Sequence, residues 1–299
     1  MRRHASLDFG PFLFLATLEG LVQAAVLTLT ALGLSLVFGV MRVVNVAHGE
    51  FFMLGAVLAW WVSSLVAGSP ALGFLLALVA SPLVVGAIAL ASERLILRRL
   101  NYHPESTIVA TIGLLYIIQQ TTLILYGPDA RSVEAPFYFR VEFPDFGYSG
   151  YKLVVIAASA LLLLGTWFVM RRTRLGLVMR ATQYDSETAQ AFGIPVGRVY
   201  AQVFALGAML AAVAAVLVVP IQQAHYLMGL DPLLLSFIVV IIGGLGSLGG
   251  TVLAAVLIGL SDGILSVFFS PTLAKIVSTL LVALVLVFRP EGLFGKRAR

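Results

Sequence analysis

A short polar segment between two long apolar runs carries the side chains best suited to chemistry. It contains Arg42, Asn45, His48, Gly49 and Glu50. Asn45 and His48 are three residues apart, so in a helix they would share one face, whereas Glu50 would not. If the flanking runs cross a membrane, ionisable side chains at that depth are costly and face a cavity or a polar partner. The segment is therefore either part of a polar path or an ordinary cytoplasmic turn with hydrated side chains.

Two other kinds of chemistry fit this segment poorly. A metal site needs three or four ligands, and one histidine and one glutamate two residues apart do not supply them. A general acid–base pair would need a nucleophile, and none accompanies His48 and Glu50.

A glycine-rich segment, GGLGSLGG, lies near the end of the chain. Its glycines are Gly243, Gly244, Gly246, Gly249 and Gly250. Glycine-rich loops cradle phosphate when they follow a strand and open a helix, usually with a lysine. Here there is no lysine and no strand pattern, so a nucleotide site is not expected. Between membrane helices, clustered glycines permit close backbone approach or a re-entrant turn, which is the structure we expect here.

The longest polar stretch runs from Arg171 to Gly197 and opens with four arginines, at 171, 172, 174 and 180. Such a cluster beside an apolar run marks the cytoplasmic side of a membrane. From Gly176 to Phe192, apolar and small residues recur every three or four positions, which predicts an amphipathic helix. Gly193 and the proline at 195 end it. The helix would either lie on lipid or be gripped by a cytosolic partner, with Ala181 and Ala189 forming a small face.

Composition decides what surrounds these segments. Of the 299 residues, 60% are hydrophobic and 11% are charged, and the mean hydropathy is +1.03. Soluble domains have roughly a quarter of their residues charged, so the chain is expected to be an all-α polytopic membrane protein with one domain over residues 1–299. The net charge of +5 does not indicate nucleic-acid binding, because the basic residues lie at the ends of apolar runs. The chain has no cysteine and hence no disulfide or thiol chemistry.

Nine apolar runs are long enough, or nearly so, to cross a membrane. They are Phe12–Val40, Phe51–Ala67, Ala71–Ala91, Thr107–Tyr126, Leu153–Met170, Val199–Val219, Pro232–Gly243, Thr251–Phe269 and Thr272–Phe288. The first is too long for one straight span and the seventh is too short. We therefore expect about eight spans, with broken or re-entrant helices.

Charged residues in the loops predict the sides of the membrane. The acidic loop 127–151 is expected outside, and the arginine-rich loop 171–197 inside. The amino terminus is ambiguous, because Arg2 and Arg3 favour the inside while counting spans back from Arg99 puts it outside. A break in the first run, at Gly33 or Gly39, would remove this conflict.

Other membrane functions are less well supported. An ion-coupled secondary carrier could use Glu19 and Asp262, which lie within apolar runs, but no inverted repeat is evident in the sequence. A membrane enzyme would need convergent histidines and acids, yet the four histidines, at 4, 48, 103 and 225, are scattered. The chain is therefore not expected to be an enzyme.

Three separated stretches together resemble one family. They are Val44–Gly55, Arg174–Val199 and Gly243–Leu260, and the closing residues 289–295 also match. The chain resembles the permease subunits of branched-chain amino-acid ABC importers, of the LivH type, which implies a type II-like importer permease in the bacterial inner membrane. Urea and short-chain amide importers have permeases with very similar motifs, so they are the alternative.

The resemblance implies roles for particular residues. In such permeases the cytosolic loop contacts the ATPases, and the matching positions are Arg174, Gly176, Arg180, Ala181, Ala191, Phe192, Gly193 and Ile194. Candidates for lining the translocation path of a zwitterionic amino acid are Asn45, His48, Gly49 and Glu50.

The resemblance also implies partners. They are a homologous permease of the LivM type, two cytosolic ATPases and a periplasmic or surface-tethered binding protein. The chain has no GxxxxGK[ST] motif, so ATP is expected to bind to the partners and no cofactor is expected in this chain.

Overall fold

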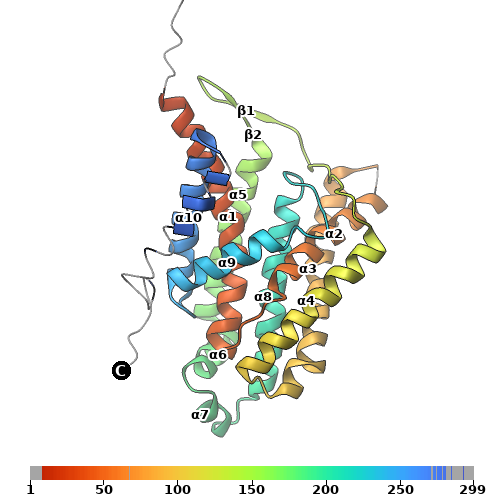
Figure 1. Ribbon diagram of the computed structural model, residues 1–299, viewed down its shortest axis with the longest axis vertical. Helices are drawn as coiled ribbons and strands as arrows, with labels where there is room; N and C mark the ends of the chain where they lie inside the picture. The colour runs from red at the N-terminus through yellow and green to blue at the C-terminus, as the bar shows by residue number, and fades with distance from the viewer. Residues whose placement is uncertain are drawn as a thin grey trace, which may run out of the picture.

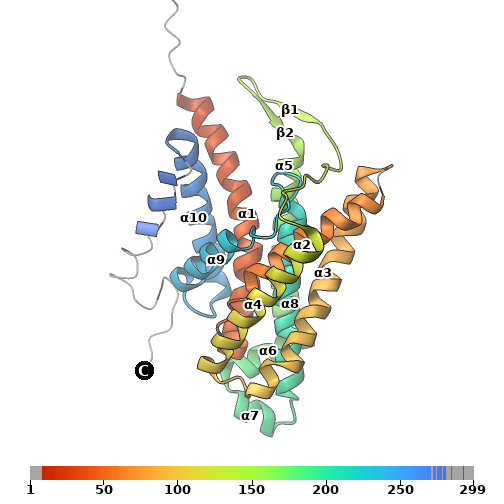
Figure 2. The same cartoon turned by 45° about the vertical axis from the view of Figure 1, so that its right-hand side comes forward.

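The computed structural model describes residues 9–66, 68–270, 272–273, 275–277, 279–280, 284 and 292. The helices are α1 (Phe9–Met41), α2 (His48–Leu65), α3 (Pro70–Leu95), α4 (Pro104–Tyr126), α5 (Gly150–Arg172), α6 (Arg174–Tyr184), α7 (Ser186–Ala191), α8 (Val196–Val218), α9 (Leu230–Gly243) and α10 (Leu248–Phe268). A 3₁₀ turn, Leu97–Leu100, follows α3, and the strands β1 (Arg140–Glu142) and β2 (Gly147–Ser149) pair antiparallel. Figures 1 and 2 show the helices as one elongated bundle.

Six of the described helices are long and apolar enough to cross a membrane: α1, α3, α4, α5, α8 and α10. The helices α2, with 18 residues, and α9, with 14, are shorter. This agrees with the expected mixture of full spans and broken helices. The last predicted span, Thr272–Phe288, lies largely outside the described residues.

Helix α1 is continuous over 33 residues, so the predicted break at Gly33 or Gly39 is wrong. The chain breaks instead between Met41 and His48. Gly33 serves as a contact, because a Cβ added there would lie 2.3 Å from the Gly207 carbonyl oxygen of α8. The absence of a side chain thus lets two buried helices touch backbone to backbone.

Small residues also join α1 to α10, which run antiparallel. Gly263 packs on Gly20, and Gly259 packs on Ala24 one turn deeper. Nearer the other end of the pair, Thr251 Oγ1 donates a hydrogen bond to Ser35 Oγ at 2.9 Å. Close backbone approach and interhelical hydrogen bonds of this kind hold membrane helices together, since lipid provides little hydrophobic force between them.

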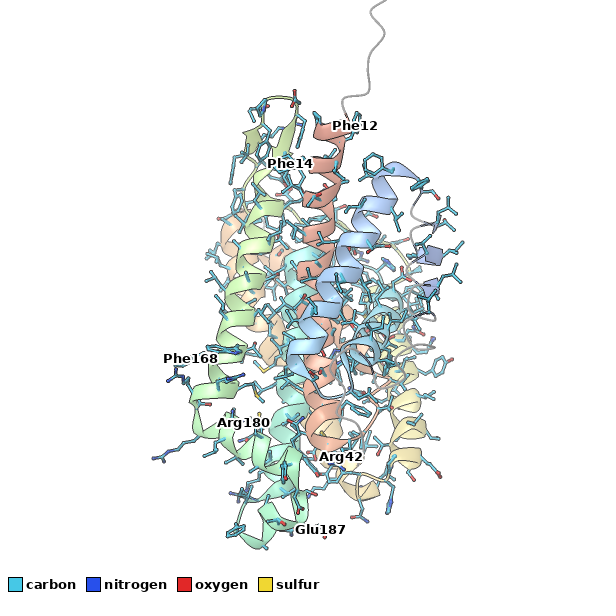
Figure 3. The ribbon with its side chains drawn as sticks, turned by 90° about the vertical axis from the view of Figure 1, so that its left-hand side faces the viewer. Phe12, Phe14, Arg42, Phe168, Arg180 and Glu187 are labelled. Atoms are coloured by element: carbon cyan, nitrogen blue, oxygen red, sulfur yellow. The ribbon has the colours of Figure 1, made fainter. Side chains whose placement is uncertain are left out.

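The two ends of the bundle carry the loops that the charges assigned to opposite sides. The β1–β2 hairpin lies at one end with Phe12 and Phe14, and Arg42, Arg180 and Glu187 lie at the other (Figures 1 and 3). We call these the outer and the cytosolic end. Helix α1 begins at the outer end (Figure 1), as the count of spans back from Arg99 requires. Arg2 and Arg3, which favoured the inside, lie outside the described residues.

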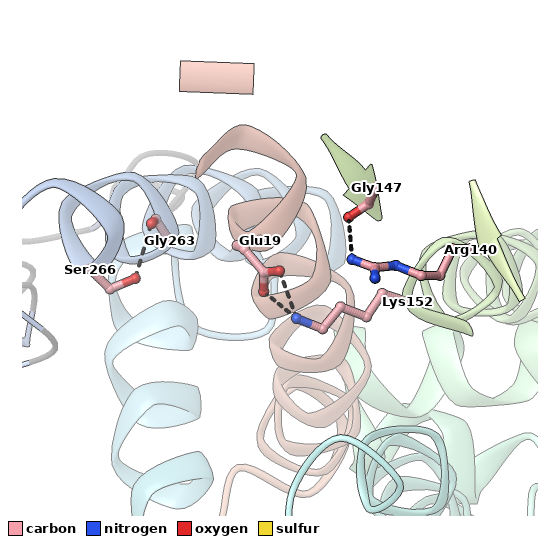
Figure 4. Close-up of polar contacts among 6 residues, drawn as sticks. All are labelled: Glu19, Arg140, Gly147, Lys152, Gly263 and Ser266. Atoms are coloured by element: carbon pink, nitrogen blue, oxygen red, sulfur yellow. Dashed lines mark hydrogen bonds and ion pairs between the residues drawn. The ribbon is translucent and has the colours of Figure 1, made fainter. Parts of the chain in front are cut away.

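The outer end is an ordered cap. Arg131 and Ala224, from the loops before β1 and after α8, form a backbone bridge with two hydrogen bonds of 2.9 Å. The Arg131 guanidinium lies 4.3 Å from the centre of the Trp60 ring, a cation–π contact. Lys152, at the start of α5, forms an ion pair of 2.6 Å with Glu19 of α1 (Figure 4). The loops are therefore fixed to the bundle.

Candidate functional site

The polar segment after α1 turns back into the membrane. The ring Nε2 of His48, the first residue of α2, donates a hydrogen bond to the Thr30 carbonyl oxygen at 2.9 Å. Thr30 lies three turns before the end of α1, about 16 Å along the axis. Because the hydrocarbon core of a bilayer is about 30 Å thick, α2 begins near mid-depth and runs to the outer end. Figure 2 shows α2 and α9 crossing the bundle at this height.

Specific hydrogen bonds hold this re-entrant segment. Asn45 Oδ1 accepts a hydrogen bond from the Ala47 N–H at 3.1 Å, and Thr111 Oγ1 of α4 accepts one from the Val46 N–H at 3.2 Å. Irregular backbone is tolerated at membrane depth only when its polar groups are satisfied in this way. The expectation that Asn45 and His48 share a helix face is wrong, because Asn45 precedes α2 and bonds the turn that starts it.

The polar side chains of this segment are buried. Asn45 and Glu50 are each 1% exposed and His48 is fully buried, so the alternative of a hydrated cytoplasmic turn is wrong. Within the described residues, His48 Nδ1 and both Glu50 carboxylate oxygens are buried without a hydrogen-bond partner. Buried polar atoms without partners are uncommon in native proteins and are explained by an ordered water or ion, by strain or by a functional role.

The starts of α2 and α9 touch each other. A Cβ on Gly49 would lie 2.3 Å from the Gly229 carbonyl oxygen, and a Cβ on Gly229 would lie 2.1 Å from the Gly49 carbonyl oxygen. Gly229 is the residue that caps α9. We call this contact the glycine crossing. Two short helices therefore begin at one point in the middle of the bundle.

The two half-helices follow an inverted pattern. Helix α1 descends to the cytosolic end and α2 rises from the crossing, whereas α8 rises to the outer end and α9 leads from the crossing to the cytosolic side (Figure 1). The long helices of the two pairs also meet through glycines, at the Gly33–Gly207 contact. The sequence showed no inverted repeat, and the structure shows only that these two helix pairs run in opposite directions.

At the cytosolic end, the predicted single helix from Gly176 to Phe192 is two helices, α6 and α7. They are separated at Asp185, whose Oδ1 accepts hydrogen bonds from the N–H groups of Glu187 and Thr188, both at 3.0 Å. Hydrogen bonding with Thr188 lowers the pKa of Asp185 below its usual value. Asp185 is a helix cap, which the periodicity alone did not reveal.

Three apolar side chains of α6 and the end of α7 are exposed, whereas Met179 of α6 is buried. Leu177, Tyr184 and Phe192 are 60%, 84% and 83% exposed. Ala189, predicted to belong to a small outward face, is instead buried against the bundle. Gly193 has a φ of +84°, the left-handed conformation expected after a helix end.

The other predicted positions in this region divide by exposure. Gly176 is buried, Ala181 and Ile194 are partly buried, and Arg174, Arg180 and Ala191 are exposed. A Cβ on Gly176 would lie 2.3 Å from the Met170 carbonyl oxygen, so glycine is needed where α6 folds back on α5.

The glycine-rich segment is the turn between α9 and α10. Gly244 and Gly246 have φ of +95° and +78°, and Gly250 packs directly on the Gly243 carbonyl group. Gln183 Nε2 of α6 donates a hydrogen bond to the Gly246 carbonyl oxygen at 3.1 Å. The cytosolic helices are thereby bonded to the turn that carries α9, a link that sequence reasoning missed because its partners are 63 residues apart.

Comparison with known proteins places this geometry in a family. The family model described as "branched-chain amino acid transport system / permease component" matches residues 16–286. The chain belongs to this family. It is therefore a multi-pass transport permease of the cell membrane and not an enzyme, and it works with ATPase and substrate-binding partners.

The similar proteins cover nearly the whole chain. It is 28% identical to the high-affinity branched-chain amino acid transport system permease protein BraD of Pseudomonas aeruginosa, over 93% of this chain and 94% of that protein. It is 26% identical to LivH of Escherichia coli K12, with the same coverage. A chain of the structure "PsaBC from Streptococcus pneumoniae in complex with Fab" has a TM-score of 0.50 and 13% identity, with 92% of each chain covered, and shares the fold.

Proposed function

We propose that this chain forms part of the translocation path of an ATP-driven importer for branched-chain amino acids. The names of BraD and LivH support this substrate class. The ATPases are separate polypeptides, and a second permease of the LivM type completes the path. Nucleic acid has no part in this function.

The observation that carries the proposal is the exposed apolar face of α6 and α7. Leu177, Tyr184 and Phe192 are exposed at the cytosolic end, among arginines that indicate the inner side. A helix that presents apolar anchors away from its own core fits a groove on a partner. The coupling contact comprises Arg174, Gly176, Arg180, Ala181, Ala191, Phe192, Gly193 and Ile194, with Gly176 acting from beneath as a packing position.

The glycine crossing closes the path in the conformation described above. Movement of α9 away from α2 would uncover Asn45, His48, Gly49 and Glu50, and the unpaired polar atoms of His48 and Glu50 would then meet water or substrate. The turn at Gly243, Gly244, Gly246, Gly249 and Gly250 transmits this movement, because it is bonded to α6. On the outer side, the binding protein docks on the cap in which the Arg131 and Ala224 loops are joined.

The test uses the importer reconstituted in liposomes with its ATPases and binding protein. Arg180→Glu reverses a charge on the docking face and is expected to abolish leucine uptake. The ATP hydrolysis that leucine and the binding protein stimulate should be lost as well. Phe192→Ser removes an exposed anchor and should weaken binding of the ATPases about 30-fold, as loss of an interface anchor costs roughly 2 kcal/mol. Arg140→Glu, on the opposite end of the bundle, is the matched control and should still recruit the ATPases. Uptake by the chain alone, without any partner, would refute the proposal.

A further inference from the structure

A cavity of about 490 Å³ occupies the outer half of the bundle, between α1, α9, α10 and the segment after α8. This size falls within the roughly 300–1,000 Å³ of small-molecule sites. Its polar lining comes from Gln23, Gln222, His225, Asp231, Asp262 and Lys275. It reaches inward to Thr30, the residue that receives the His48 hydrogen bond, so its inner end lies beside the glycine crossing.

The charges in this cavity lie deep in the membrane. Asp231 is two residues beyond Gly229, and its carboxylate Oδ2 lies 2.6 Å from Lys275 Nζ. The two side chains are 68% and 54% exposed, and both line the cavity. Exposed charges at this depth are stable only where water or a polar partner replaces lipid. The cavity is therefore a polar space.

One acid in the cavity is left over. Asp262 of α10 is partly buried, and among the described residues its carboxylate has no hydrogen-bond partner and no contact ion pair, although Lys275 attracts it from a longer distance. With one lysine and two aspartates, the cavity has a formal charge of −1 when histidine is neutral. Its free acceptor suits an ammonium group. Apolar residues, including Val26, Leu27 and Leu235, form the rest of the wall.

We infer that this cavity holds the transported substrate, an α-amino-acid zwitterion with a hydrocarbon side chain. This inference rests on the proposed function and adds the binding groups. The substrate ammonium donates to Asp262, its carboxylate accepts from Lys275, and its side chain packs on Leu27 and Leu235. Lysine has three donor hydrogens, so Lys275 can keep Asp231 while it binds the substrate. The first turn of α9 also lines the cavity, and its positive end favours the carboxylate.

Both charges of the ligand are needed for this fit. A compound without the ammonium leaves Asp262 unpaired, and one without the carboxylate leaves Lys275 with Asp231 only. Hydrogen bonds to charged groups contribute about 1.5–3 kcal/mol, so loss of either should weaken binding at least tenfold. Leucine should therefore bind better than 3-methylbutylamine or 4-methylpentanoate, which have the same hydrocarbon part.

The first experiment measures leucine uptake by the complete importer in liposomes. Asp262→Asn and Lys275→Met are each expected to lower the rate at least tenfold while ATP hydrolysis by the assembled complex continues. Glu105→Gln neutralises an exposed acid on α4, away from the cavity, and should leave uptake unchanged. Unchanged uptake in Asp262→Asn would overturn the inference.

The second experiment detects occupancy of the cavity directly, because a chain without cysteine can be labelled at a single introduced site. Ser266→Cys lies in the cavity and Ser261→Cys lies on the same helix outside it. In membranes containing the full chain, leucine should slow the reaction of Cys at position 266 with a charged thiosulfonate at least fivefold, and have no effect at 261. Adding Asp262→Asn should remove this protection without changing the reaction rate measured in the absence of leucine.

The two proposals fail differently. If the wild-type importer takes up no leucine with ATP, the proposed function fails, whatever the labelling shows. If uptake is normal but leucine gives no protection at 266, or if 4-methylpentanoate protects equally well, the cavity is not the zwitterion site while the proposed function stands.

Discussion

The glycine crossing gives the most direct test of the fold. In Gly49→Ala, the new methyl group would be placed 2.3 Å from the Gly229 carbonyl oxygen, far inside van der Waals contact. The obstructing atom belongs to the backbone and cannot rotate away. The same oxygen accepts the Leu233 N–H at 3.1 Å, the hydrogen bond that starts α9. Either α2 and α9 separate, or the first turn of α9 is distorted.

The expected cost can be built from these two effects. Overpacking a tight core typically costs about 1–3 kcal/mol, and a weakened backbone hydrogen bond adds about 1 kcal/mol. The free energy of unfolding should therefore fall by about 2–4 kcal/mol. Gly113→Ala is the matched control, because that glycine is also helical but its added Cβ would have no neighbour within 4 Å. Alanine there should be neutral or stabilising by about 0.5–1 kcal/mol.

The assay is an unfolding titration of the purified chain in mixed detergent micelles, with leucine uptake measured in parallel. Gly229→Ala should resemble Gly49→Ala, since a Cβ there would lie 2.1 Å from the Gly49 carbonyl oxygen. The double variant should cost less than the sum of the single variants, because one separation of the helices relieves both clashes. Fully additive costs, or a Gly49→Ala chain as stable as Gly113→Ala, would show that the two half-helices do not meet here.

Three further predictions concern contacts at the two ends. Gln183→Ala removes the hydrogen bond to the Gly246 carbonyl oxygen and should lower the free energy of unfolding by about 1 kcal/mol. The number of leucine molecules transported per ATP hydrolysed should also fall. If that number is unchanged, the contact between α6 and the glycine turn does not couple the two. Lys152→Met removes the partly buried ion pair with Glu19. Because exposed pairs contribute about 0–1 kcal/mol, stability and uptake should change little, and a strong loss of uptake would favour ion-coupled chemistry at Glu19. Hydrogen bonding lowers the pKa of Asp185, so its cap is fully formed above the usual pKa of 3.8 and is lost as the pH falls through the lower pKa of the folded chain. Faster amide exchange in α7 at low pH, absent in the cap-preserving Asp185→Asn, would confirm this.

The sequence was sufficient for features that depend on local pattern. Apolar runs predicted the long helices, because a run of apolar residues is a local pattern. The sides of the membrane that the arginines indicate stay a prediction. The shortness of Pro232–Gly243 correctly indicated a helix that does not span, and α9 has 14 residues. Gly193 was expected in the left-handed conformation and has it.

The predictions that were wrong concern residues whose contacts lie far away in the sequence. A glycine within a long apolar run can mark a break or a close contact, and Gly33 is a contact because Gly207, far along the chain, lies against it. Nothing near Gly33 distinguishes the two cases. Likewise, the pattern allowed Asn45 to lie on a helix face or in a turn. The neighbouring Val46 N–H donates a hydrogen bond to Thr111 Oγ1 of another helix, which holds this segment as a turn. One sequence without its contacts cannot supply such information.

The contacts described above form one continuous mechanical connection through the chain. Gln183 joins the cytosolic helix α6 to Gly246, the glycine turn joins α6 to α9, and the other end of α9 rests on Gly49 of α2. A displacement of α6 by a partner would thus act on α9 as a short lever, because 14 residues of helix are only about 21 Å long. The crossing cannot be compressed, since two backbones in contact cannot interpenetrate, so a push on α9 toward α2 passes to α2. Glycine is required at both ends of α9 for the same reason. Gly229 touches the Gly49 backbone of α2, and Gly243 touches the Gly250 backbone of α10, so a movement of α9 passes directly to its neighbours.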